Sequence, residues 1–350
     1  MSIIDNAIYT MLNGKRTITK PIFIKDFDAD NKQLNDLIEI SKNVSPEKRK
    51  FIEKDIKLLK QGLEGEKNVY YELKNSFLPM LCLYDIRLEY DDYVAQYDFI
   101  IITRKFIYVL ETKKLNGDIE ITKDGDFIRI IKSDNGKIIK KEGMYSPISQ
   151  NERHVKILKE ILTKEKLIKN FPIKSAVVIA NPKTIVDKSK CPKSIQNNIY
   201  KYDQIVNLIK KELEDKSNER DLLEKFLYNI ADYLISNNKP ITYNYAAKYS
   251  LDNEDLKILK TVKEEQENNN LGSDKSNDNA QIYEALKKYR LEMSKKENIK
   301  AFWVFTNEEL NSLIEKMPKT KDELLQIKGF GQKKVEKYGD EILSILNKRG

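Results

Sequence analysis

One stretch, residues 95–113, constrains the fold of this chain more than any other. It contains two runs of β-branched and aromatic residues on either side of the polar pair Arg104-Lys105. Such a pattern predicts two antiparallel strands joined by a tight turn. With Arg104 and Lys105 as the loop, Asp98 lies opposite Glu111, whereas a longer loop would shift this pairing. The same register pairs Thr103 with Phe106, Ile102 with Ile107 and Ile100 with Val109.

The two opposed carboxylates are unfavourable in so apolar a hairpin. Like charges across a strand pair repel, and burying each charge costs free energy unless a cation neutralises it. A divalent metal ion would do so. Because side chains alternate along a strand, Lys113 shares a face with Glu111. The hairpin thus predicts an Asp, a Glu and a Lys at one end; alternatively, Asp98 is a strand-entry residue and Glu111 and Lys113 form a solvated strand exit.

The order Asp98, then Glu111-x-Lys113, resembles the PD-(D/E)xK nuclease core. The neighbouring residues resemble the nuclease-related domain (NERD). Four motifs carry this second resemblance: Gly62-x-x-Gly65-Glu66, Ala95-Gln96-x-Asp98, Glu111-Thr112-Lys113-x-x-x-Gly117 and Pro147-x-x-Gln150-Asn151-x-x-His154. Four patterns in that order are more specific than any one of them. The resemblance implies an α/β restriction-endonuclease-like core with a mixed β-sheet.

The resemblance also implies roles for individual residues. Asp98 and Glu111 would hold Mg²⁺ or Mn²⁺, with Glu66 as a third acid. Lys113 would position or activate the attacking water, and Gln150 would orient the substrate or a metal-bound water.

Two of the residues in these motifs have a structural alternative. Glu66 lies in the first turn of a helix predicted over 66–76, where the helix dipole favours a carboxylate. His154 is the only histidine in the chain, which excludes a histidine-rich metal site. We expect it to be a packed, hydrogen-bonded helix residue.

Five segments are expected along the chain. They are an N-terminal extension (1–61), the nuclease-like core (62–214), a helical connecting segment (215–263), a flexible acidic linker (264–279) and a C-terminal module (280–350). The extension includes a helix predicted over 46–61, separate from the core helix. The linker is predicted because it is polar and almost without apolar residues, as flexible tethers are.

The C-terminal module is predicted to be all-helical. It resembles the helicase and RNase D C-terminal domain (HRDC) through Leu286-Lys287-Lys288-Tyr289-Arg290, Phe305-Thr306-Asn307-Glu308-Glu309-Leu310, Met317-Pro318, Leu324-Leu325 and Ile327-Lys328-Gly329-Phe330-Gly331. Two glycines let the backbone approach a phosphate, and the start of the following helix presents free N–H groups. The residues predicted to bind nucleic acid are Lys328, Gly329, Gly331, Lys333, Lys334 and Lys337. The alternative is a plain glycine turn between helices.

Composition narrows the function classes. The chain has 63 Lys and Arg against 55 Asp and Glu, a net charge of +8, which favours an anionic partner such as nucleic acid. Cys82 and Cys191 suggest neither a disulfide framework nor a zinc site. No apolar run approaches the ~20 residues of a membrane helix, so a soluble, cytoplasmic protein is expected. The helicase motif Gly-x-x-x-x-Gly-Lys-Ser/Thr does not occur.

The sequence therefore predicts a Mg²⁺-dependent nuclease core, acting on DNA, with a tethered module that binds nucleic acid weakly and without sequence preference. Tethering raises the local concentration of substrate at the core. The expected partners are DNA and a helicase or repair complex, and the expected setting is DNA repair or defence. The alternative is a non-catalytic nucleic-acid-binding or repair-complex interaction protein that keeps the nuclease fold as a scaffold.

Overall fold

The computed structural model describes residues 17–29, 31–218, 220–252, 255, 274–297, 304–327 and 329–347. The chain divides into two compact units, residues 1–250 and residues 251–350. Each unit is described by itself. In the parts of the chain that the structure describes, no helix is both long and apolar enough to cross a membrane.

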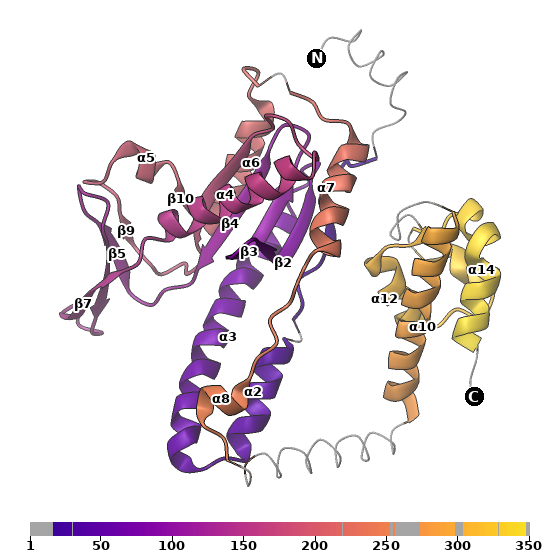
Figure 1. Ribbon diagram of the computed structural model, residues 1–350, viewed down its shortest axis with the longest axis horizontal. Coiled ribbons are helices and arrows are strands. Elements are labelled where there is room, and N and C mark those ends of the chain that lie inside the picture. Colours follow the sequence, from indigo (N-terminus) through magenta and orange to yellow (C-terminus); the bar gives the residue numbers. More distant parts are fainter. Residues whose placement is uncertain are drawn as a thin grey trace. The chain divides into compact units, whose positions relative to one another are not determined.

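A six-stranded mixed sheet forms the centre of the first unit (Figure 1), which confirms the predicted α/β core. The pairs β2–β3 and β3–β4 are antiparallel, and the pairs β1–β2, β4–β8 and β8–β10 are parallel. In spatial order the strands are β1 (Ile22–Lys25), β2 (Leu81–Tyr90), β3 (Tyr93–Ile102), β4 (Ile107–Lys113), β8 (Ile173–Ile179) and β10 (Ile199–Lys201).

The β3–β4 hairpin has the predicted register. Ile100 pairs with Val109 and Ile102 with Ile107. The Thr103 amide donates to the Phe106 carbonyl at 2.9 Å, which leaves Arg104 and Lys105 as the loop.

Helices cover both faces of this sheet because its strands are apolar on both sides. In β3, Ile100 and Ile102 pack beneath α4 (Pro147–Lys164) and α7 (Glu224–Ser236). Phe99 and Ile101 face the opposite way, toward α3 (Pro46–Lys74) and α6 (Ile205–Glu214). Nearly continuous apolar runs are expected of strands that are buried on both faces.

Helix α3 differs from its prediction. The sequence predicts separate helices over 46–61 and 66–76, but the structure has one helix of 29 residues. Gly62 and Gly65 weaken a helix by about 1 kcal/mol each without ending it, and no proline interrupts the segment. Gly65 is instead a packing position, since a Cβ there would lie 2.7 Å from the Cβ of Lys114.

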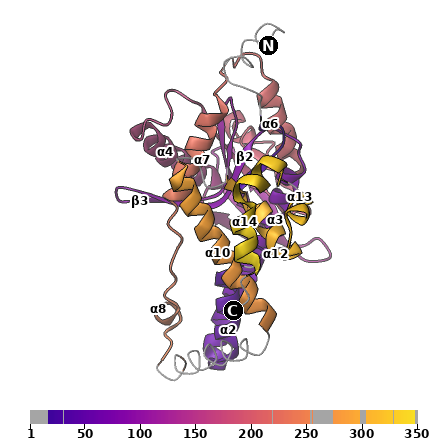
Figure 2. The same cartoon turned by 90° about the vertical axis from the view of Figure 1, so that its right-hand side faces the viewer.

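Helices α2 (Lys32–Lys42) and α3 run side by side and extend from one end of the sheet, as Figures 1 and 2 show. The short helix α8 (Tyr245–Tyr249) packs on this pair, where the Tyr249 hydroxyl donates to Asp55. The segments predicted as extension and connector thus contribute β1, α2, α7 and α8 to the first unit.

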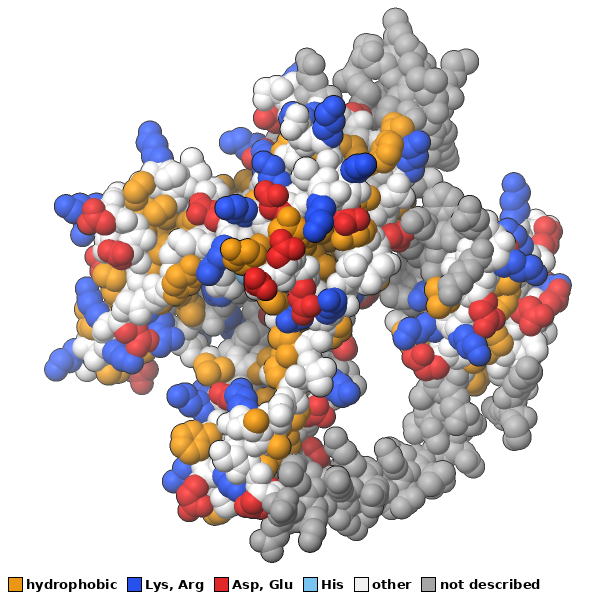
Figure 3. Space-filling view, viewed as in Figure 1, with side chains coloured by type: hydrophobic (Ala, Val, Ile, Leu, Met, Phe, Trp, Pro, Cys, Tyr) orange, Lys and Arg blue, Asp and Glu red, His pale blue; other side chains and the backbone are white. Residues whose placement is uncertain are grey.

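A second sheet, in the order β7-β6-β5-β9, packs beside β8 through an apolar cluster that includes Ile119, Ile121 and Val177. Its basic residues form ion pairs with its acids, as Lys132 does with Asp118, and Figure 3 shows the two charge types interspersed on the face in view. The strands are β5 (Asp118–Ile121), β6 (Phe127–Lys132), β7 (Ile138–Met144) and β9 (Val186–Asp187); α5 (Lys193–Gln196) and the 3₁₀ turn η1 (Tyr202–Gln204) precede α6.

The second unit is all-helical over its described residues, as predicted. Its helices are α10 (Asp274–Lys296), α12 (Asn307–Lys316), α13 (Lys321–Leu325) and α14 (Gln332–Asn347). Buried Leu286, Phe305 and Phe330 belong to its core. Within the predicted linker, residues 264–273 lie outside the described residues and α10 begins at Asp274.

The packing of α3 predicts opposite effects for its two glycines. Gly65→Ala places a Cβ 2.7 Å from the Cβ of Lys114 and 3.2 Å from that of Ala180, so we expect it to lower stability by about 1–3 kcal/mol. Gly62→Ala is the matched control, because nothing lies within 4 Å of its added Cβ. It should gain about 1 kcal/mol of helix propensity. Thermal unfolding of the two variants measures the difference, and a Gly65→Ala protein as stable as Gly62→Ala contradicts the packing argument.

Candidate active site

The candidate site forms where β3 and β4 separate. Their pairing ends at Phe99 and Leu110, while β4 continues beside β8 as far as Lys113. Beyond the end of the β3–β4 pairing, the Thr112 amide donates to Oδ2 of Asp98 at 2.6 Å. A side-chain carboxylate thus satisfies a backbone donor at the gap, which fixes Asp98 between the two strands.

In both β2 and β3, the regular alternation of side chains between the two faces of the sheet is interrupted next to Asp98. In β2, Leu83 and then Ile86 face α4 and α7; in β3, Tyr97 and then Ile100 do so. Regular alternation would separate such residues by two positions rather than three. Asp85 carries the irregularity in β2, with φ of +51°.

The register of β2 and β3 places Asp85 opposite Asp98. Tyr84 pairs with Phe99, and Ile86 pairs with Tyr97. Asp85 follows Tyr84 in β2 and Asp98 precedes Phe99 in β3, so the two aspartates lie opposite each other. One further step of the β3–β4 register brings Glu111 beside Asp98. Three acidic residues on three adjacent strands therefore form one row.

Glu111 is buried, with 3% of its surface exposed. Its Oε1 accepts from Nζ of Lys113 at 2.6 Å, and its Oε2 lies 3.5 Å from Nδ1 of His154. Burial by itself raises the pKa of Glu111, but the nearby His154 and Lys113 outweigh it, so this pKa is lowered. Nζ of Lys113 also reaches Oε1 of Gln150 at 3.3 Å.

His154 has a larger place in the site than the sequence indicated. It is packed on α4 as predicted, with its ring centroid 5.5 Å from that of Tyr97. It also faces Glu111, and the spacing of Gln150 and His154 on one helix face was the only sequence signal for this contact.

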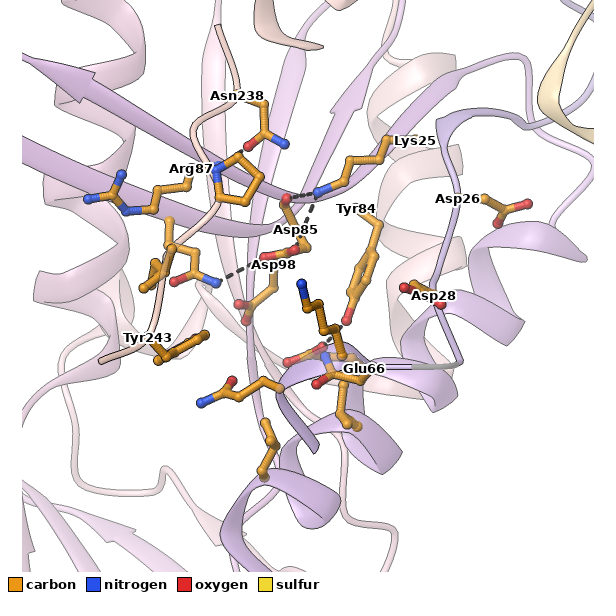
Figure 4. Close-up of a pocket in the computed structure, with 18 residues that line it drawn as sticks. Lys25, Asp26, Asp28, Glu66, Tyr84, Asp85, Arg87, Asp98, Asn238 and Tyr243 are labelled. Carbon is orange, nitrogen blue, oxygen red and sulfur yellow. Dashed lines mark hydrogen bonds and ion pairs between the residues drawn. The ribbon is translucent and has the colours of Figure 1, made fainter. Parts of the chain in front are cut away.

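Glu66 approaches from α3. Its Oε2 accepts from the Tyr84 hydroxyl at 2.5 Å. The helix-dipole alternative is wrong, because α3 begins at Pro46 and Glu66 lies far from its first turn. Glu66 and Asp98 line one cavity of about 340 Å³, which Figure 4 shows.

The acids raise one another's pKa. Burial and then the charges of Glu111 and Glu66 hold the pKa of Asp98 well above its usual range. Burial, with Asp85 and Glu111 nearby, also raises the pKa of Glu66. Such a site gains from a cation, and carboxylate oxygens are the donors that Mg²⁺ prefers.

Each acid has a different partner in this structure. Asp98 accepts from the Thr112 amide, Glu66 from Tyr84 and Glu111 from Lys113. Among the residues that the structure describes, no three His, Cys, Asp or Glu side chains are arranged to hold a metal ion.

Segments outside the four sequence motifs complete the cavity. Lys25 at the end of β1 contacts Oδ2 of Asp85 at 3.3 Å, and Nε2 of Gln96 donates to Oδ1 of Asp85 at 2.9 Å. Asn238 and Tyr243 line the cavity from the segment after α7. The sequence predictions missed all of these except Gln96, which stands in a motif. Asp85 becomes recognisable only when the β2–β3 register is known.

The glycine motif of the second unit surrounds a buried acid. Gly329 has φ of +100°, and a Cβ there would overlap the carboxylate of Glu309. Glu309 accepts from the Thr306 amide at 2.7 Å and, with both oxygens, from Nζ of Lys334 at 2.8 Å. Gly329 therefore makes room for an ion pair.

The remaining residues of the predicted nucleic-acid-binding set differ in their contacts. Lys337 pairs with Glu297, and Gly331 precedes the start of α14. Lys328 lies outside the described residues. Lys333 is exposed and has no ion pair with any residue that the structure describes.

Comparison with known proteins identifies two families within the chain. The family model of the nuclease-related domain matches residues 61–180, and that of the HRDC domain matches residues 279–346. The chain thus carries these two domains in the predicted order. Together they support a nucleic-acid-associated, nuclease-like protein.

Individual relatives are similar over a short stretch. The ATP-dependent DNA helicase Q-like 4B of Arabidopsis thaliana is 38% identical over 65 residues, which are 18% of this chain and 6% of the helicase. The ATP-dependent DNA helicase RecQ of Bacillus subtilis is 37% identical over 62 residues, 18% of this chain and 10% of that protein. The matches therefore span about a tenth or less of these helicases.

Among solved structures, the D. radiodurans RecQ HRDC domain 3 is 42% identical, with a TM-score of 0.19. That match covers 20% of this chain and 91% of the solved one.

Asp98→Asn should stabilise the metal-free protein, because it removes a buried charge and keeps an oxygen for the Thr112 amide. We expect a rise in Tm of about 2 °C or more at neutral pH, the response to roughly 1 kcal/mol in a domain of this size. A raised carboxyl pKa means that the folded state binds the proton more tightly than the unfolded chain. The gain in Tm from Asp98→Asn should therefore be absent at pH values below the ordinary pKa range of Asp, and it should grow as the pH rises.

Thermal unfolding of wild type and Asp98→Asn across this pH range tests the argument. Asp92→Asn, at the exposed β2–β3 turn, is the matched control and should change Tm little. Equal pH profiles for all three proteins would contradict the burial argument.

Substitutions of Lys334 and Lys333 should have different effects, the first on the stability of the second unit and the second on nucleic-acid binding. Lys334→Ala leaves the buried Glu309 without its cation and should cost about 1.5–3 kcal/mol of the second unit's stability. Lys333→Ala removes an exposed cation and should change stability by less than about 0.5 kcal/mol. It should weaken single-stranded DNA binding and lower the salt slope by about 1. Calorimetry and anisotropy titrations at several salt concentrations measure the two effects; a Lys333→Ala protein with unchanged binding would argue against a phosphate contact.

Proposed function

We propose that this protein is a Mg²⁺- or Mn²⁺-dependent nuclease that hydrolyses phosphodiester bonds in DNA, and that its HRDC domain holds the nucleic acid. The observation that carries the proposal is the gap between β3 and β4, which brings Asp98, Glu111 and Lys113 together with Gln150. An acid pair can hold a metal ion that activates water for phosphodiester hydrolysis, and a lysine beside it can stabilise the developing charge.

Asp98, Glu111 and Glu66 are the residues that would hold the metal. The raised pKa values of Asp98 and Glu66 support this assignment, because a nearby cation would relieve the repulsion that raises them. When bound, the ion supplies charge neutralisation at the phosphate and lowers the pKa of a bound water. For the three acids to act together, Glu66 must turn from Tyr84 and Glu111 must share its contact with Lys113.

Lys113 and Gln150 would act on the substrate. Nζ of Lys113 lies between Oε1 of Glu111 and Oε1 of Gln150, so its position is fixed from two sides. An ammonium held in this way can orient the attacking water and stabilise the charge that develops on the phosphate. The side-chain NH₂ of Gln150 would position the substrate.

One observation favours a second candidate. Lys113 compensates the charge of Glu111 without a metal, and His154 lies 3.5 Å from its other oxygen. A non-catalytic protein that keeps the nuclease fold as a scaffold for nucleic-acid binding would have the same contacts.

The HRDC domain supports a setting beside a helicase or repair complex. The names of two relatives, both ATP-dependent DNA helicases, support this context. Roles in DNA repair or defence and a cytoplasmic location stay predictions from the sequence.

Cleavage assays distinguish the two candidates. We expect purified wild type with Mg²⁺ or Mn²⁺ to cut labelled DNA, and Glu111→Ala and Lys113→Ala to lose at least about 100-fold in rate, as removal of one electrostatic group from an active site does. Thermal unfolding confirms that both variants are folded. If all three proteins bind DNA but none cuts single-stranded, duplex or flapped substrates, the scaffold candidate replaces the nuclease.

A further inference from the structure

The cavity beside Asp98 and Glu66 is covered by a segment that lies outside residues 61–180, the part of the chain that matches the nuclease-related domain. Residues 238–243, here named the strap, connect α7 to α8. Asn238, Pro240, Ile241 and Tyr243 of the strap line the cavity opposite Glu66 and Asp98. A ligand that reaches the two acids through this cavity therefore passes beneath the strap.

Both ends of the strap are anchored. At one end the Lys239 amide donates to the Arg87 carbonyl and the Arg87 amide donates to Oδ1 of Asn238, each at 2.9 Å. Beyond the other end, the Tyr249 hydroxyl donates to Asp55 of α3 at 2.8 Å. The strap thus bridges from an edge of β2 to the α2–α3 pair.

The cavity is too small for a duplex. Its volume is about 340 Å³, at the lower end of the range for small-ligand sites. One unpaired nucleotide is of the right scale.

The lining has the chemistry to hold such a nucleotide. Tyr243 is 37% exposed as a residue, and its ring stacks on that of Tyr245 with centroids 5.7 Å apart and an interplanar angle of 11°, so the ring is already ordered. Exposed aromatic rings hold single-stranded nucleic acids by stacking on their bases. Asn238 and Gln96 supply amides, and Lys25 supplies a cation. Because carboxylates also line the cavity, binding of a phosphate there should require a divalent cation.

We propose that this cavity binds one unpaired nucleotide of a single-stranded nucleic acid, with the strand passing beneath the strap and the base stacked on Tyr243. Cleavage at this site rests on the proposed nuclease function, but the binding does not. The strap would then exclude duplex from Asp98 and restrict the substrate to single strands and unpaired flaps.

A binding assay tests the nucleotide site directly. The full chain is titrated in Ca²⁺ with a fluorescent single strand and with a closed hairpin duplex of the same length. We expect tighter binding of the single strand, and Tyr243→Ala should weaken it about tenfold, as loss of one stacked base does. Tyr243→Phe should retain it, because the ring remains. Tyr71→Ala removes a tyrosine that is more exposed, on α3 and outside the cavity, and is the control.

A cleavage assay tests the strap. Wild type in Mg²⁺ or Mn²⁺ should cut single strands and flaps at least about tenfold faster than closed duplex. Replacing Pro240 and Ile241 together by glycine loosens the strap, and should raise the rate on closed duplex relative to the rate on single strands.

The possible failures are distinguishable. If wild type cuts duplex and single strands equally, the nuclease function stands and the proposed restriction is overturned. If nothing is cut but the single strand still binds through Tyr243, the nucleotide site stands and the nuclease function fails. Unchanged binding by Tyr243→Ala overturns the nucleotide site.

Discussion

The candidate active site depends on the separation of β3 from β4 beyond Phe99 and Leu110. Along the paired part of the hairpin, backbone groups satisfy one another and the side chains form a dry core. Past it, the Thr112 amide needs another acceptor, because an unpaired backbone donor is costly in a buried setting. Asp98 supplies that acceptor. The same hydrogen bond therefore closes the end of the sheet and holds a carboxylate where strands β3 and β4 diverge.

The local part of this arrangement could be predicted from the sequence. The register of β3 and β4 follows from a two-residue loop and the alternation of apolar residues, and the structure confirms it. Once the register is known, the proximity of Asp98 and Glu111 follows. The contacts of Lys25 and Tyr243 with the cavity could not be predicted, because both residues lie more than 50 positions along the chain from Asp98.

Glycine was the less reliable signal. The sequence predicted separate helices on either side of Gly62 and Gly65, but the structure has one helix there, in which Gly65 packs closely against Lys114 and Ala180. At Gly329 it suggested room for a phosphate, whereas the space is occupied by the carboxylate of Glu309. At Gly329 the sequence located a close approach correctly, but a neighbouring side chain decides what approaches.

The charges of the site have a consequence for metal affinity. Lys113 and His154 already lower the pKa of Glu111, while the pKa values of Asp98 and Glu66 are raised. An ion would find one ionised acid engaged by a lysine and two acids that resist ionisation. Binding must therefore displace protons and part of an ion pair, which costs free energy and makes affinity depend on pH. A substrate phosphate adds a negative ligand, and can offset that cost by sharing the ion with Asp98 and Glu111. Metal and nucleic acid should accordingly bind more tightly together than either does alone.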